Sequence, residues 1–194
     1  LMLLQATNTD WQNIAWQFAK NFQVELFRYF LFAGITFLTF YVLGKKFFAR
    51  FKVQQKFPVS KQMWRELRYS LLSLVIFALN GLFVFTCYRH GYTRMYMDIH
   101  AHSWAYFVFS IFVFIVAHDF YFYWTHRLMH WKKIYPYVHK IHHLSHDPTP
   151  WAAYAFHPFE AVIQAAIFPI LAFTEPGHPG AILAWGLYQA GWNV

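Results

Sequence analysis

Long apolar stretches alternate with short basic or histidine-rich segments along this chain. Residues 29–43 and 69–88 contain no charged residue, and residues 104–124 form a third strongly apolar stretch. The first stretch approaches about 20 residues when the apolar turn at 22–26 is included. A helix of about 20 apolar residues spans the ~30 Å hydrocarbon core of a bilayer. The pattern therefore predicts three membrane-spanning helices.

Further apolar segments lie near both ends of the chain. Residues 152–172 and 181–192 flank the turn sequence TEPGHPG. They are expected to form either a pair of helices that crosses the membrane and returns or a re-entrant hairpin. Near the start, Trp11, Ile14 and Phe18 share one helical face, which predicts an interfacial amphipathic helix over residues 1–20. The expected fold is an all-α integral membrane helical bundle of about four spans. Residues 1–194 are expected to form a single membrane domain.

Composition and charge agree with a membrane protein and exclude several other classes. Charged residues make up 12% of the chain and hydrophobic residues 58%, whereas soluble domains carry roughly a quarter charged residues. The net charge of +8 does not indicate nucleic-acid binding, because eight basic residues concentrate between Lys45 and Arg68 against the single acid Glu66. Such a segment is expected in the cytoplasm. Cys87 alone provides neither a disulfide nor a thiolate metal site.

Histidines are unusually dense between residues 118 and 157, where eight of the twelve occur. His126 and His130 are spaced i, i+4, so they share a face at the cytoplasmic end of the third span. A second helix is predicted from Pro136 to Asp147, with His139 and His143 again at i, i+4. His142 on that helix points about 100° away from His143. Five imidazoles from two helices predict a metal site for iron, zinc, copper or nickel.

Several polar side chains near these histidines are candidates for supporting them. His118 and His146 read equally well as ligands or as hydrogen-bonded neighbours. Asp119 lies seven residues before His126 on nearly the same face, so its carboxylate is expected to accept a ring N–H from that histidine. Arg127 is expected to pair with Glu160, Asp119 or a lipid phosphate.

Three motifs carry a resemblance to a known family. They are HDFYFYWTHRLMH at 118–130, HKIHHLSH at 139–146 and HPFE at 157–160. Over residues 105–194 the chain resembles the fatty acid hydroxylase/sterol desaturase superfamily of membrane-bound non-haem di-iron enzymes. The resemblance implies an oxidoreductase that uses O2 to hydroxylate or desaturate a sterol, fatty acyl or related lipid. It also implies two iron ions and an electron donor such as a cytochrome b5-like protein, a ferredoxin or a reductase.

The resemblance also assigns roles to individual residues and exposes one departure. It implies metal ligands, with no separate catalytic residue, at His126, His130, His139, His142, His143 and His157. The residues that it places around the ligands are His118, Asp119, Tyr123, Arg127, His146 and Glu160. The family has a third histidine motif of HXXHH type, and this sequence ends at Val194 before one occurs. The ligand set is therefore expected to be incomplete in the sequence as given.

Two other classes of protein remain open at this point. A histidine-rich membrane protein could bind or transport metal without oxygenase activity, although transporters usually place polar ligands near the bilayer midplane. A structural protein with a basic face could bind anionic headgroups, but that function does not require the HXXXH and HXXHH spacing.

Overall fold

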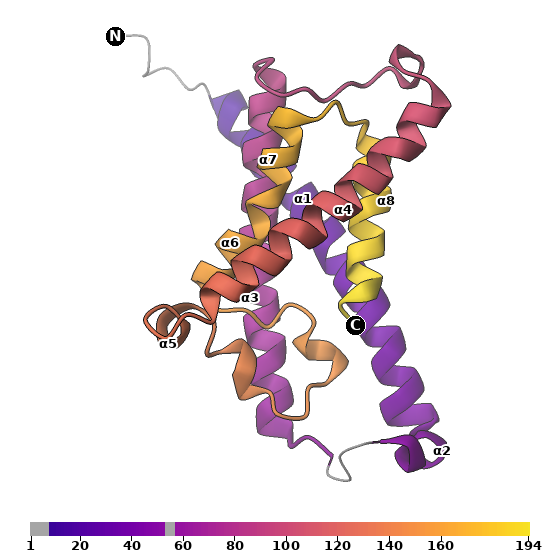
Figure 1. Cartoon of the computed structure of the whole chain (residues 1–194), viewed down its shortest axis with the longest axis vertical. Coiled ribbons are helices and arrows are strands. Elements are labelled where there is room, and N and C mark those ends of the chain that lie inside the picture. Colours follow the sequence, from indigo (N-terminus) through magenta and orange to yellow (C-terminus); the bar gives the residue numbers. More distant parts are fainter. Residues whose placement is uncertain (1–7, 53–56) are drawn as a thin grey trace.

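The computed structural model describes residues 8–52 and 57–194, and every regular element in these ranges is helical (Figure 1). The long elements are α1 (Asn8–Phe37), α3 (Ser60–Arg89), α4 (Trp104–Met129) and α8 (Pro179–Trp192). The shorter ones are the π-helix η1 (Leu38–Leu43), α2 (Lys45–Phe48), η2 (Ala49–Phe51), η3 (Ile99–Ala101), α5 (Tyr135–Val138), η4 (His142–Leu144), η5 (Pro150–Ala152), α6 (Pro158–Ala165) and α7 (Ile167–Thr174). The predicted all-α fold is confirmed.

Three helical segments are long and apolar enough to cross a membrane, namely Trp11–Leu43, Ser60–Arg89 and Trp104–Met129. A shorter apolar segment covers Pro158–Thr174. In Figure 1, α6 and α7 run along one side of α4 and α8 returns on the other, so the C-terminal apolar segments form an out-and-back pair. The protein is an integral membrane helical bundle, as predicted, with three long spans and this shorter pair.

The prediction of a separate interfacial helix at the N-terminus is wrong for the described residues. Helix α1 begins at Asn8 and continues without a break into the first span; residues 1–7 lie outside the described ranges. The polar residues of α1 find partners inside the bundle. Asn21 donates to the carbonyl of Ala78 on α3 at 3.4 Å, and Arg28 pairs with Glu25. Polar side chains in the middle of α1 are therefore accommodated within the bundle.

Helices α1 and α3 pack closely and provide the scaffold for the rest of the chain. Tyr29 and Ala33 of α1 are buried against Leu74 of α3, and residues 153–154 complete this core. A Cβ atom at Gly81 would lie only 3.1 Å from Asn21 Nδ2, so glycine permits the close approach of the two helices.

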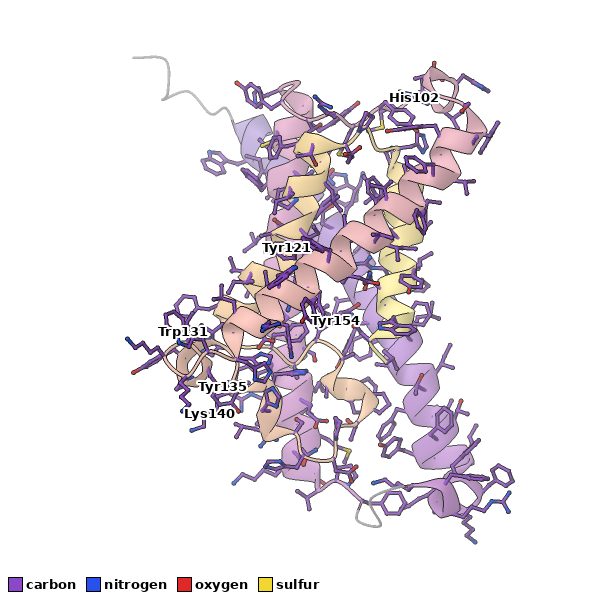
Figure 2. All side chains as sticks on the ribbon, viewed as in Figure 1. His102, Tyr121, Trp131, Tyr135, Lys140 and Tyr154 are labelled. Atoms are coloured by element: carbon purple, nitrogen blue, oxygen red, sulfur yellow. The ribbon has the colours of Figure 1, made fainter. Side chains whose placement is uncertain are left out.

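The two ends of the bundle differ in chemistry. At one end, the connector between α3 and α4 is hydrogen-bonded to the last turns of α7, from Arg94 N to Ala172 O, and to the turn before α8, from Tyr96 N to Gly177 O. His102 lies at this end, whereas Tyr135 and Lys140 lie far from it, beyond the end of α4 (Figure 2). Helix α2, which carries part of the basic segment, also lies at the end opposite His102 (Figures 1 and 2). Lys52 forms an ion pair with Asp147 at 2.6 Å, so basic and histidine-rich segments are in direct contact.

Candidate metal centre

The last turns of α4 provide the first pair of histidines. Helix α4 has 26 residues and is about 39 Å long at 1.5 Å per residue, which exceeds the ~30 Å hydrocarbon core. His126 lies in its last turn and His130 is its C-cap residue. Their Nε2 atoms are 3.1 Å apart. The i, i+4 spacing thus places both rings on one face at the end of the helix.

The second pair of histidines is close together, but the prediction that a single helix carries it is wrong. Pro136 does lie in the first turn of a helix, yet α5 ends at Val138 and the chain then forms turns and the short 3₁₀-helix η4. His139 and His143 still face each other, with their Nε2 atoms 3.0 Å apart. Two short helical elements therefore replace the single helix expected from Pro136 to Asp147.

The two pairs meet at one point. One nitrogen from each of four histidines lies within 4.8 Å of the others, and these residues are His126, His130, His139 and His143. The ring of His139 is central, with its centroid 4.5 Å from that of His126 and 4.7 Å from those of His130 and His143. This four-histidine cluster brings together two sequence motifs from opposite sides of the turn after α4.

Glu160 holds the central histidine from behind. Its Oε1 atom lies 2.7 Å from Nδ1 of His139, and both side chains are essentially fully buried. Glu160 is in the first turn of α6, which Pro158 begins and His157 caps by accepting the N–H of Phe159. The HPFE motif therefore starts a helix and directs a carboxylate at His139, while His157 itself stays outside the four-histidine cluster.

His142 belongs to the same region but faces a cavity instead of the cluster. Its ring centroid is 5.5 Å from that of His139. The cavity has a volume of about 790 Å³, and His126, His142 and Glu160 line it together with aromatic residues that include Phe122 and Phe156. This volume lies within the range of about 300–1,000 Å³ typical of small-molecule sites.

The histidine side chains fit a bound metal ion. Burial lowers the pKa of His139 to about 4, and burial together with the neighbouring His139 lowers the pKa of His142 to about 4 as well. These rings are therefore neutral near pH 7, and neutral imidazole is the form that binds a metal. Buried polar atoms without a hydrogen-bond partner include Nδ1 of His126, Nδ1 of His142 and Oε2 of Glu160. Such atoms are normally satisfied in proteins, and a metal with its ligands would account for them.

Several supporting contacts differ from those expected from the sequence. Asp119 lies 3.2 Å from His118 instead of bonding His126, whose Nδ1 has no partner. Arg127 donates to the hydroxyl of Tyr123 at 3.1 Å, so neither carboxylate proposed for it is its partner. His146 is exposed in the segment after η4.

One polar contact near the cavity was missed by the sequence analysis. His118 Nδ1 lies 2.9 Å from the side-chain nitrogen of Gln189 on α8. Both residues line the cavity. The available signal was an amide side chain within an apolar segment, because such residues usually mark an internal contact in membrane helices.

Replacing Glu160 tests its effect on the central histidine. We expect Glu160→Gln to weaken metal binding about 10- to 100-fold, the usual effect of removing the partner of a ligand histidine. The amide keeps an oxygen that can accept a hydrogen bond but removes the ionisable carboxyl group that lies against Nδ1 of His139. Competition with a chelator, monitored through the absorbance of Co²⁺, measures the change. Glu175→Gln, at the turn before α8, is the matched control and should bind as tightly as the wild type.

Comparison with known proteins agrees with this arrangement. The profile of the family described as fatty acid hydroxylase matches residues 111–194. The chain is 32% identical to rat lathosterol oxidase over 132 residues, which cover 67% of this chain and 44% of that protein. It is 30% identical over 173 residues to a Delta(7)-sterol 5(6)-desaturase of Schizosaccharomyces pombe, covering 88% of this chain and 58% of the yeast protein.

A second fungal relative gives the same result over a shorter stretch. The Delta(7)-sterol 5(6)-desaturase ERG3B of Gibberella zeae is 34% identical over 118 residues, covering 61% of this chain and 36% of that protein. The chain thus spans about half the length, or less, of these curated relatives. No solved structure gives a significant match. Residues 111–194, which the family profile matches, contain both histidine pairs and the HPFE motif. The chain belongs to the fatty acid hydroxylase/sterol desaturase superfamily.

Proposed function

We propose that this protein is the membrane domain of an oxidoreductase that uses O2 to desaturate or hydroxylate a lipid of the sterol class. The convergence of four imidazoles beside a cavity of about 790 Å³ is the observation that carries this proposal. The relatives named above are sterol desaturases and a lathosterol oxidase, which supports a sterol as the substrate. A metal transporter is not favoured, because the four-histidine cluster lies at the end of α4 and none of these relatives is a transporter.

The proposed metal is iron, with two ions as in the rest of the superfamily. His126, His130, His139 and His143 are the proposed ligands of the four-histidine cluster, and His142 is a further ligand from the cavity side. When bound, iron would activate O2 for removal of hydrogen from an unactivated C–H bond. Imidazole nitrogen is a suitable ligand for iron, and the single cysteine, Cys87, lies in the last turn of α3, far in sequence from the histidine motifs.

The protein's own residues would orient the ligands and control access to them. Glu160 Oε1 lies 2.7 Å from Nδ1 of His139, and a hydrogen bond there would fix the ring and leave Nε2 free for the metal. Phe40, Phe48, Phe122 and Phe156 line the cavity together with Trp192. Such a lining would hold the apolar body of a lipid and limit the entry of water to the reacting carbon.

The orientation in the membrane follows from the basic segment. We propose that the four-histidine cluster faces the cytoplasm, because Lys52 of the basic segment pairs with Asp147, four residues after His143, and basic segments remain on the cytoplasmic side. A cytochrome b5-like protein, a ferredoxin or a reductase would deliver electrons from this side, with the lysines and arginines of the segment providing a surface for an acidic partner.

The experiment that tests the function combines metal analysis with product analysis. Protein purified from membranes should contain about two iron atoms per chain. With an electron donor and O2, it should convert a Δ7-sterol to a product two mass units lighter, or 16 units heavier if hydroxylated. Anaerobic samples and iron-depleted samples serve as controls. Zinc in place of iron, with no product from any sterol, would contradict the proposal.

A further inference from the structure

The segment that carries His139, His142 and His143 has little regular structure of its own. Helix α5 has four residues and η4 has three, so few backbone hydrogen bonds fix the chain between Tyr135 and Trp151. A metal site held by such a segment requires support from outside, because ligands must be kept within about 0.5 Å of their working positions. The structure shows this support on α3.

Two side chains near the start of α3 hold the backbone just after His143. Arg65 donates at 2.8 Å to the carbonyl of Leu144, which is the residue after His143. Gln62 donates to the carbonyl of Asp147, also at 2.8 Å. In Figure 1 the segment between α5 and α6 lies across the lower half of α3. Helix α3 therefore fixes the position of the chain that leaves the second histidine pair.

Glu66 lies at the centre of these contacts and is only 1% exposed. Its carboxylate accepts from Gln62 Nε2 at 2.8 Å, from the hydroxyl of Thr149 at 2.6 Å and from the backbone N–H of Thr149 at 3.4 Å. A buried carboxylate is costly unless hydrogen bonds replace its hydration. All three contacts come from donors, which suits a group that can only accept. Glu66 thus links Gln62 to Thr149. Gln62 binds the supported segment, and Thr149 is part of it.

A second contact holds the same segment two residues further along. Ser70, one turn after Glu66 on α3, donates to the carbonyl of Trp151 at 2.8 Å. Tyr29 of α1 donates to the same carbonyl at 2.8 Å. Contacts at Leu144, Asp147, Thr149 and Trp151 therefore fix the whole connection between the second histidine pair and the helix that carries Glu160.

We propose that Glu66 is a positioning residue for the metal centre. Through Gln62 and Thr149 it fixes the backbone of residues 144–151, and so sets where the rings of His142 and His143 lie relative to His126 and His130. Glu66 lies outside residues 111–194, the stretch that the family profile matches. The inference rests on the proposed function in one respect, that these histidines hold a metal.

Substitutions at Thr149 and Glu66 test this role. Thr149→Val keeps the shape of the side chain but removes the hydroxyl, whereas Thr149→Ser keeps the hydroxyl. We expect Thr149→Val and Glu66→Gln each to weaken Co²⁺ binding about 10- to 100-fold and to change the visible absorption of bound Co²⁺. Thr149→Ser should bind within about threefold of the wild type. Because Thr149→Val is nearly isosteric, it decides the question even if Glu66→Gln does not fold.

The controls separate positioning from general stability. Ser73→Ala removes another buried hydroxyl of α3, one that bonds only to Tyr69 within its own helix, and should leave Co²⁺ affinity and spectrum unchanged. The thermal midpoint of each metal-free variant is measured in parallel. Wild-type Co²⁺ affinity and spectrum in Thr149→Val, with or without a lower midpoint, would overturn the positioning role alone, whatever the result for Glu66→Gln. Failure of the wild type to bind Co²⁺ or Fe²⁺ would overturn this inference together with the proposed metal site.

Discussion

Replacing His139 with alanine should abolish metal binding by the four-histidine cluster and reduce sterol oxidation to less than about 1% of the wild-type rate. His139 is fully buried and lies closest to the centre of the cluster, within 4.7 Å of three other imidazole rings. The change removes a proposed ligand and also leaves the carboxylate of Glu160 buried without its partner. Removing one member of a buried polar pair costs roughly 1–5 kcal/mol. The metal-free variant should therefore unfold at a lower temperature than the wild type.

Metal content, product formation and the thermal midpoint together measure these effects. His102→Ala is the control, because His102 is exposed at the opposite end of the bundle (Figure 2) and should alter none of the three quantities. Substituting Glu160 as well should add little further loss of stability, since the double variant His139→Ala/Glu160→Leu no longer buries an unpaired carboxylate. Wild-type metal content in His139→Ala would exclude the four-histidine cluster as the metal site.

The parts of the structure that depend on local spacing were predictable from the sequence. Apolar length alone indicated the second and third spans, because a helix must bury its backbone polar groups in its own hydrogen bonds within the bilayer. The spacing of His126 and His130 was enough to place both rings on one face of α4. The expected location of this pair beyond the hydrocarbon core agrees with the length of α4.

Contacts between residues far apart in the sequence were not predictable in the same way. Glu160 is 21 residues from His139, and Thr149 is 83 residues from Glu66; no local period links such pairs. The helix expected from Pro136 to Asp147 is instead broken after Val138, and the side chains of α3 bond the carbonyls of Leu144 and Asp147. In a continuous helix these carbonyls would accept hydrogen bonds from the helix itself. Here the side chains of α3 are their partners, so tertiary contacts outweigh local helix propensity.

The polar residues of α1 illustrate the same limit. An interfacial helix over residues 1–20 was expected because Trp11, Ile14 and Phe18 share one helical face in a region that also contains polar residues. In the structure, Asn21 reaches Ala78 on α3, and Glu25 and Arg28 pair with each other. The cost of a polar group depends on partners that only the folded bundle provides, and the helical-face pattern of residues 1–20 does not reveal them.

Replacing His142 with alanine should separate catalysis from the integrity of the four-histidine cluster. His142 lies beside the cluster and lines the cavity, and its Nδ1 is buried without a hydrogen-bond partner. We expect His142→Ala to lower the rate of sterol oxidation at least 100-fold, because a ligand on the cavity side is lost where the substrate would lie.

The same variant should keep its fold and its tight metal site. The four nitrogens of the cluster do not include His142, and the spans are held by helix packing, so the thermal midpoint of the metal-free protein should change by no more than a few degrees. Co²⁺ titration should still show one tight site, in contrast to His139→Ala, which should show none. Product formation at the wild-type rate in His142→Ala would contradict its assignment as a ligand. Loss of all metal binding would instead place His142 within the cluster itself.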